Sequence, residues 1–146
     1  MITIRRARRI AATPDAIFAA LSDPQQLATL LPRVRQIEML EQGENQARIA
    51  THMAFGPFGD IRNEGRVSWL NGRELQFESP TPVQVTSRWV LTPAEGGTDL
   101  EASLALDLGP LLGPLAAFVP ADRVADVVGP DLDAALDAVS KRVTQE

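Results

Sequence analysis

His52 is the only histidine of this 146-residue chain, which contains no cysteine. The missing thiol excludes a disulfide, a thiolate nucleophile and a cysteine-bound metal, and a single imidazole excludes any site that needs two. By residue type, His52 is the best candidate for proton transfer, but it shares the strand parity of Arg48, which predicts the outer surface. We therefore predict no metal site and no cofactor, and we assign no catalytic residue.

Three neutral hydrogen-bonding side chains, Thr51, Asn63 and Ser87, fall on the apolar parity of the central part of the chain, together with the indoles of Trp69 and Trp89. None of these groups is a strong acid or base, so their chemistry suits ligand recognition better than proton transfer. The competing interpretation is that the polar side chains bond only to backbone or water in a filled core, where both indoles also pack.

The segment from Val34 to Leu108 must position these side chains. Its residues alternate with a period of two and are divided by the turn sequences QGEN, GPFGD, NGR, SPTP and AEGG, which predicts about six antiparallel strands. Asn71-Gly72 predicts a tight hairpin with a two-residue turn, because both residues tolerate the positive φ that such a turn requires. One parity is apolar and the other is charged, so we expect one covered and one wet face.

Two short helices are predicted near the N-terminus, after a strand over ITIRRARRI. Thr13 and Asp23 each precede a proline, as helix N-caps do, and the second helix should end before Pro32. The strand carries Arg5, Arg6, Arg8 and Arg9, which we interpret as a solvated edge rather than an anion site, since charged edges discourage aggregation. Its irregular alternation leaves open whether Arg6 and Arg8 face the interior.

A long amphipathic helix is predicted at the C-terminus, because apolar residues recur at steps of three and four from Val124 to Val143. Pro130 falls inside this pattern. The apolar phase continues across the proline, so we expect one kinked helix rather than two. It should cover the apolar face of the sheet.

The composition fits one globular domain over residues 1–146, with a formal net charge of −5. An excess of acidic residues argues against nucleic acid as a partner, because such binding depends on Lys and Arg. The N-terminus has no continuous apolar segment typical of a signal peptide, which predicts a cytoplasmic protein.

The sequence LGPLLGPLAAFVPA, within residues 108–121, contains no charged side chain and is too short to span a membrane. It is interpreted as the bent, buried start of the C-terminal helix. The alternative is a movable portal whose apolar side chains meet the ligand, a membrane surface or a second subunit of a homodimer during ligand exchange.

The order of elements, the segment ATPDAIFAALSDPQQLATLLPRV and the later Gly96-Gly97-Thr98-Asp99-Leu100 together resemble the START-like (SRPBCC) superfamily that includes the birch pollen allergen. The first segment is most similar to its bacterial polyketide cyclase/dehydrase and lipid-transport branch, with Phe18 in place of the commoner Trp. The resemblance implies an α+β helix-grip fold, in which a curved seven-stranded antiparallel sheet wraps around the long C-terminal helix.

In that fold, the sheet and the helix enclose a cavity, so the apolar parity becomes its predicted lining. A mostly apolar cleft with few polar groups suits a lipid, a quinone or a polycyclic, polyketide-like molecule, typically in about 300–1,000 Å³. The predicted ligand-binding residues are Thr51, Met53, Phe55, Asn63, Val67, Trp69, Phe77, Val85, Ser87, Trp89, Leu104, Leu115, Phe118 and Leu132.

Three functions stay open. The first is a carrier or sequestering protein for a small hydrophobic molecule. The second is a polyketide cyclase or aromatase, an activity that the superfamily includes and that relies largely on pocket shape. The third is a protein-interaction module similar to the chaperone-activating branch, which would use the charged outer face around Arg48, Arg62, Arg66 and Arg88. Mixed charges on that face also serve solubility alone.

Overall fold

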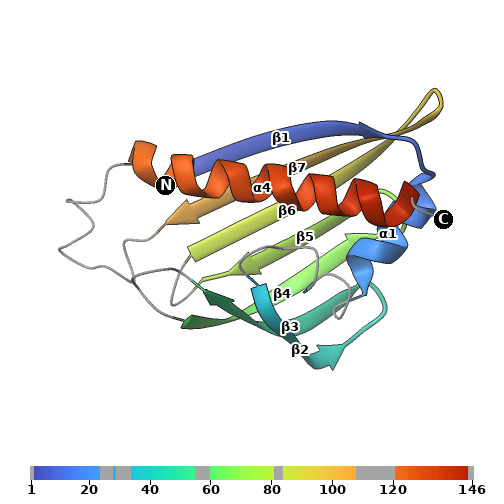
Figure 1. Ribbon diagram of the computed structural model, residues 1–146. Helices are drawn as coiled ribbons and strands as arrows, with labels where there is room; N and C mark the ends of the chain where they lie inside the picture. The colour runs from blue at the N-terminus through green and yellow to red at the C-terminus, as the bar shows by residue number, and fades with distance from the viewer. Residues whose placement is uncertain are drawn as a thin grey trace.

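Seven strands form one antiparallel sheet in the order β1-β7-β6-β5-β4-β3-β2, so the first strand of the chain pairs with the last (Figure 1). The computed structural model describes residues 2–23, 28, 34–54, 60–80, 84–107 and 121–144. The strands are β1 (Ile2–Ile10), β2 (Val34–Gln42), β3 (Gln46–Ala54), β4 (Asp60–Leu70), β5 (Glu74–Ser79), β6 (Gln84–Ala94) and β7 (Gly97–Asp107).

Helix α1 (Pro14–Ser22) begins as its sequence predicts. The Oγ1 atom of Thr13 accepts a hydrogen bond from the backbone N–H of Ala16 at 3.2 Å, and Pro14 occupies the first turn, where its missing N–H costs nothing. Ile17 and Leu21, one turn apart, are buried. The second predicted short helix falls on residues 24–33, of which the structure describes only Ala28, in helical conformation.

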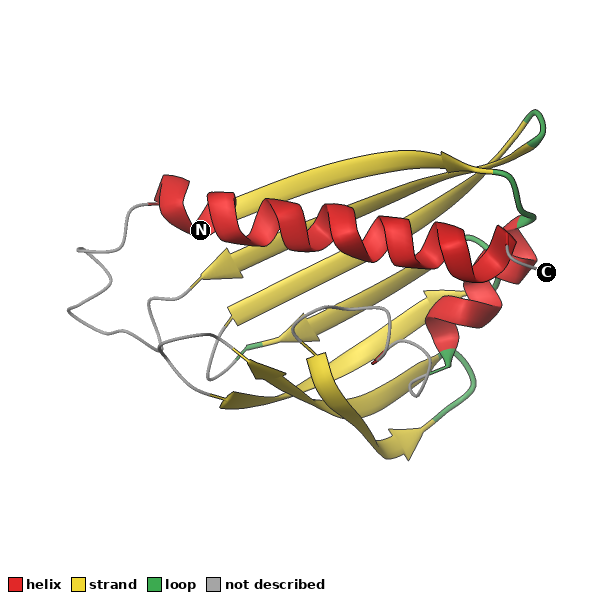
Figure 2. Cartoon of the chain, in the orientation of Figure 1, coloured by secondary structure: helices red, strands yellow, loops and turns green. Residues whose placement is uncertain are grey.

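Helix α4 (Ala121–Thr144) crosses the sheet on one side and runs as one continuous helix through Pro130 (Figure 2). Its closest neighbours are β1 and α1 rather than the middle strands. Leu132, Leu136 and Val139 form its buried stripe. The predicted helix-grip fold is thus confirmed. The segment 108–120, which carries the portal hypothesis, lies outside the described residues.

The alternation predicted for β3 to β7 is confirmed by the burial of the side chains. On β4, Ile61 and Asn63 are buried while Arg62 and Glu64 are exposed, and the other strands alternate in the same way except at Ala50 of β3, which is buried on the outward parity. The largest core cluster joins this face to both helices. It consists of Ile4, Ile10, Ile17, Leu21, Leu75, Trp89, Leu91, Leu100, Ala102, Leu132, Ala135, Leu136 and Val139.

Two turns show why their glycines are present. The Asn71-Gly72 hairpin forms, but Leu70 pairs with Glu74, so the loop has three residues rather than the predicted two, and only Gly72 has a positive φ. In the β6–β7 turn, Gly96 has a φ of 77°. A Cβ on Gly97 would collide with the carbonyl oxygen of Ile10, so glycine there lets the end of β1 approach β7.

Strand β2 is irregular, with register shifts against β3 between Val34 and Gln36 and between Met39 and Glu41. Each shift inserts one extra residue and so changes the parity of the inward face. Val34, Ile37, Met39 and Gln42 therefore share a face, although their spacing is three, two and three.

No helix among the described residues has the length and apolar character needed to cross a membrane.

Candidate functional site

A cavity of about 460 Å³ lies between the inward face of the sheet and helix α4. It exists because α4 packs against β1 and α1, while the sheet curves away from the helix toward β2 (Figure 1). Strand, helix and turn residues all contribute to its wall. The described lining is Phe18, Leu21, Ser22, Val34, Ile37, Met39, Gln42, Ala47, Ile49, Thr51, Met53, Val67, Trp69, Asn71, Leu75, Phe77, Val85, Ser87, Trp89, Leu104, Leu106, Val128, Asp131, Leu132 and Ala135.

Ten of the predicted ligand-binding residues line this cavity. They are Thr51, Met53, Val67, Trp69, Phe77, Val85, Ser87, Trp89, Leu104 and Leu132. Asn63 lies on the same face of the sheet, fully buried, but is not itself part of the wall. Phe55, Leu115 and Phe118 lie outside the described residues.

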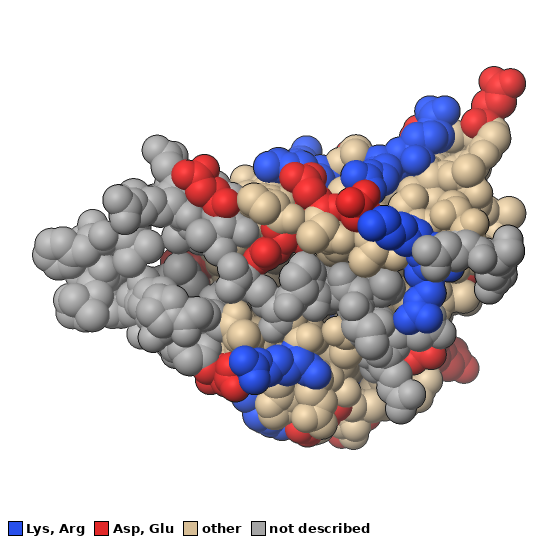
Figure 3. Space-filling view, in the orientation of Figure 1, with Lys and Arg blue, Asp and Glu red and all other residues tan. Residues whose placement is uncertain are grey.

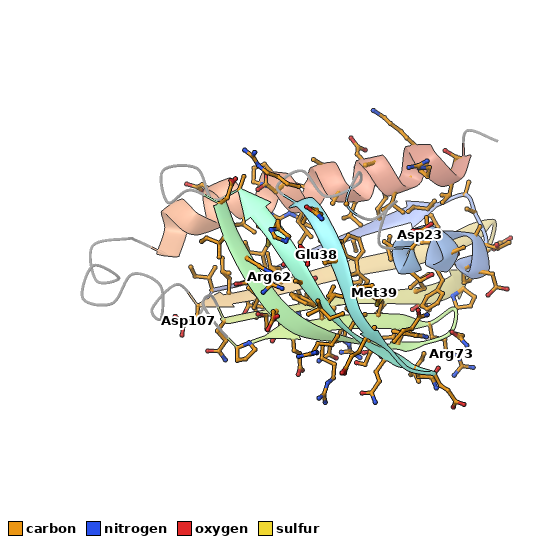
Figure 4. All side chains as sticks on the ribbon, turned by 90° about the horizontal axis from the view of Figure 1, so that it is seen from below. Asp23, Glu38, Met39, Arg62, Arg73 and Asp107 are labelled. Carbon is orange, nitrogen blue, oxygen red and sulfur yellow. The ribbon has the colours of Figure 1, made fainter. Side chains whose placement is uncertain are left out.

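Sequence reasoning missed the wall that β2, α1 and the polar side of α4 provide. On β2, the bulges break the parity on which the prediction relied, so Met39 lines the cavity while 44% of its surface is exposed. Figure 4 labels Met39 beside Glu38 on this strand. On α4, Asp131 is the one charged side chain of the described wall, and it lies one residue before the apolar Leu132. Val128 and Ala135, three residues before and four residues after Asp131, lie on the same side of the helix and also line the cavity. This helical spacing is the feature of the sequence that could have placed Asp131 in the wall.

Parts of the wall are held in place by close packing. The indole Nε1 of Trp89 donates a hydrogen bond to the hydroxyl oxygen of Ser87 at 3.2 Å, so these two lining side chains fix each other. A Cβ on Gly65 would lie 2.5 Å from the ring of Phe77 and would also collide with the carbonyl oxygen of Glu78. The absence of a side chain at Gly65 therefore allows Phe77 to lie against β4.

Two polar side chains on the inward face have unsatisfied hydrogen-bonding groups. Neither the Oγ1 of Thr51 nor the amide nitrogen and oxygen of Asn63 has a hydrogen-bond partner in the described part of the molecule. Thr51 is 6% exposed and Asn63 is 0% exposed. Burying such groups without partners is unfavourable, so both positions differ from the rest of the well-packed sheet.

The opposite face of the sheet carries His52, as its parity predicts. Its Nε2 lies 2.7 Å from an Oε1 of Glu38, and Arg62 contacts both Glu38 and Glu64 (Figure 4). Arg88 donates a hydrogen bond to Glu74, which lowers the pKa of that carboxyl. The charges of the outer face are thus largely paired with one another, an arrangement typical of a solvated surface.

Arg6 and Arg8 point to helix α4 and not into the cavity. Arg6 pairs with Asp133 at 3.3 Å, and Arg8 pairs with Asp137 one helical turn further along. Figure 3 shows basic and acidic side chains intermixed along this side of the molecule. Arg9 pairs with Asp99 of β7. Arg6 and Arg8 therefore join β1 to helix α4, and Arg9 joins it to β7.

Comparisons with known proteins agree with this architecture. The family model described as polyketide cyclase / dehydrase and lipid transport matches residues 1–144. No curated protein sequence matches the chain.

Several solved structures share the fold. The protein TTHA0849 from Thermus thermophilus has a TM-score of 0.76 and 20% identity, covering 97% of this chain and 96% of that one. The ZhuI aromatase/cyclase from Streptomyces sp. R1128 also has a TM-score of 0.76, with 19% identity over 97% and 92% of the two chains. A START superfamily protein from Mycobacterium smegmatis has a TM-score of 0.76 and 15% identity, covering 98% and 97%.

Proposed function

The chain belongs to the polyketide cyclase/dehydrase and lipid transport family, and we propose that it binds a small hydrophobic molecule between its sheet and helix α4, as a carrier or sequestering protein. The observation that carries this proposal is the cavity of about 460 Å³ with its predominantly apolar wall. A volume of that size suits a small organic molecule, and burying apolar surface there supplies the driving force. The charges of the outer face are largely paired with one another, so that face gives less support to the alternative of a protein-interaction module.

The proposal is tested by filling the cavity. Val67 lines it and is only partly buried, so the larger side chain of Val67→Phe projects into the space that a ligand would occupy. Val90→Phe makes the same change on β6, at a side chain on the opposite face of the sheet that does not line the cavity. It serves as the matched control. Binding is measured with N-phenyl-1-naphthylamine, a neutral fluorophore whose emission rises in apolar surroundings.

We expect the wild-type protein and Val90→Phe to bind the fluorophore alike, and Val67→Phe to bind it at least about tenfold more weakly, a difference of roughly 1.4 kcal/mol. Circular dichroism confirms that both variants fold. Equal affinity of the two variants would contradict a site in this cavity.

A second function, cyclisation of a polyketide-like substrate, is favoured by Asp131. This carboxylate belongs to the wall of the cavity, where it can accept a proton from a methylene group between two substrate carbonyls. The resulting enolate carbon would then attack a further carbonyl of the same chain, forming a carbon–carbon bond and an alkoxide that takes up the proton. The ZhuI protein, an aromatase/cyclase, shares the fold.

The test of this second function compares wild-type protein with Asp131→Asn on a synthetic poly-β-ketone, with ring products quantified by mass spectrometry. Loss of at least about a hundredfold in rate, with the fluorophore still bound, supports a role in proton transfer. Equal product yield with and without protein would leave binding as the function of the cavity.

A further inference from the structure

Thr51, in the cavity wall, and Asn63, fully buried beside it, are two polar side chains on the inward face of the sheet. The two residues are direct partners across β3 and β4, which places their Cβ atoms about 4.5–5.5 Å apart on the same side of the sheet. Their neighbours along the strands are apolar or lack a side chain: Ile49 and Met53 on β3, Ile61 and Gly65 on β4. Among the described residues of β3 and β4, the pair is therefore an isolated polar position.

The hydrogen-bonding capacity of this pair is unused within the described part of the chain. The amide of Asn63 offers one acceptor and two donors, and the hydroxyl of Thr51 offers one donor and an acceptor. None of these has a protein partner there, although Asn63 is completely buried. In contrast, the buried hydroxyls of Ser79 and Thr98 donate to the backbone oxygens of Glu64 and Ala12, at 2.9 and 2.7 Å. The fold thus pairs these two buried hydroxyls but leaves Thr51 and Asn63 without partners among the residues described.

One member of the pair borders the cavity and the other lies beside it. Thr51 is part of the wall, and its hydroxyl oxygen is buried behind that surface. Rotation about χ1 by one staggered step places the hydroxyl where another substituent of Cβ was, which is the route by which it can face a ligand. Asn63 lies directly beside it on the next strand.

We infer that Thr51 and Asn63 determine the specificity of the cavity by hydrogen-bonding a neutral polar group of the ligand that both accepts and donates, such as a carbonyl with an adjacent N–H or O–H. This inference rests on the proposed function and adds the class of ligand. A carboxylate does not fit, because the described wall contains no cationic side chain and its one charged residue, Asp131, is acidic. A purely apolar ligand would leave the pair unpaired.

Three naphthalenes of nearly identical shape test the inference. 2-Naphthamide offers a carbonyl and an N–H, 2-acetonaphthone offers the carbonyl alone, and 2-isopropenylnaphthalene offers neither. Their dissociation constants are measured by calorimetry and by quenching of Trp69 and Trp89, which line the cavity. Each constant is compared between variant and wild type for the same probe, so the different solubilities of the probes cancel.

Asn63→Leu and Thr51→Val retain the shape of each side chain while removing its polar atoms. We expect Asn63→Leu to weaken binding of the amide by about tenfold and Thr51→Val by about three- to tenfold, with a smaller loss for the ketone. The alkene should bind both variants as tightly as the wild type, or more tightly. Asn63→Leu should also leave the unfolding midpoint of the free protein unchanged or raise it, because it removes a buried group without a partner, whereas a structural role would lower the midpoint.

Thr86→Val is the matched control, since it makes the same change as Thr51→Val at a side chain of β6 that does not line the cavity. It should not change the preference for the amide. If all three probes bind the wild type but both variants change every affinity by the same factor, the inference is wrong while the proposed function stands. If Thr86→Val weakens binding of the amide as much as Thr51→Val does, the effect does not arise in the cavity, and the inference is also wrong. If none of the probes binds the wild type, the proposed function fails, and the inference fails with it.

Discussion

The two edge strands of the sheet meet the rest of the molecule in different ways. Strand β1 lies against helix α4, and Arg6 and Arg8 pair with acidic residues of that helix. Strand β2, at the other edge, is bulged twice and presents Met39 both to the cavity and to solvent. The comparison separates two tasks along one sheet, because the β1 side holds the helix in place while the side toward β2 leaves room for a ligand.

The largest expected difference concerns two leucines. Leu136 of α4 is 1% exposed in the core cluster and does not line the cavity, whereas Leu104 is a partly buried residue of the cavity wall. Leu136→Ala should lower the free energy of unfolding by about 3 kcal/mol, because it leaves a hole among close-packed side chains. Leu104→Ala should lower it by only about 1 kcal/mol, since part of that side chain already borders open space. Urea unfolding measures both; equal losses would contradict the distinction between a packed and an open region.

A smaller effect is expected at Gly65, beneath Phe77. A methyl group there collides with the ring and with the backbone at Glu78, so Gly65→Ala should destabilise the fold by about 1–3 kcal/mol and displace Phe77 from the cavity wall. Gly43→Ala, whose nearest contacts would lie at 3.3 and 3.5 Å, is the control. Urea unfolding gives the stability, and the fluorophore titration shows whether the wall has moved. Unchanged stability of Gly65→Ala would show that the ring yields easily.

The smallest expected effect is electrostatic and lies on the β1 side. The guanidinium of Arg8 donates a hydrogen bond to Asp137 and holds the pKa of that carboxyl below its ordinary value of 3.8. A lowered pKa in the folded state stabilises the fold above the ordinary value, and this contribution is lost as the pH falls through 3.8 to the folded value. Because both side chains are exposed, the contribution is screened and small.

Asp137→Asn should therefore lower the urea midpoint slightly at pH 7, and the difference from wild type should vanish once the carboxyl is protonated in both states. The control is Asp126→Asn, at another exposed position of the same helix. A difference that persisted in acid would show that Asp137 acts through packing and not through its charge.

Much of this architecture could be predicted from the sequence, because it depends on local patterns. The parity of β3 to β7 placed residues such as Val67 and Ser87 on the inward face, and Thr13-Pro14 marked the start of α1. A strict period of two assigns faces correctly only where the strands are regular. The predicted two-residue turn at Asn71-Gly72 was also wrong, because Leu70 pairs with Glu74 and only Gly72 takes up a positive φ.

The remaining features depend on contacts between distant parts of the chain. Two bulges in β2 changed its parity, so Val34 and Ile37 were not recognised as lining residues. Whether Arg6 and Arg8 face the cavity depends on where α4 lies, which their own sequence does not determine. Asp131 has the charge of an exposed helical residue, and only the gap between α4 and the middle strands gives it a place in the wall.

Native mass spectrometry of the protein taken directly from the cells that produce it shows whether the cavity holds a ligand. We expect, besides the 15.8 kDa chain, a species heavier by the mass of one small molecule, which organic solvent extracts and which Val67→Phe loses while Val90→Phe retains it. The extracted molecule should be neutral and largely apolar and should carry a hydrogen-bonding group. A bare chain that also takes up none of the three naphthalenes would contradict the account.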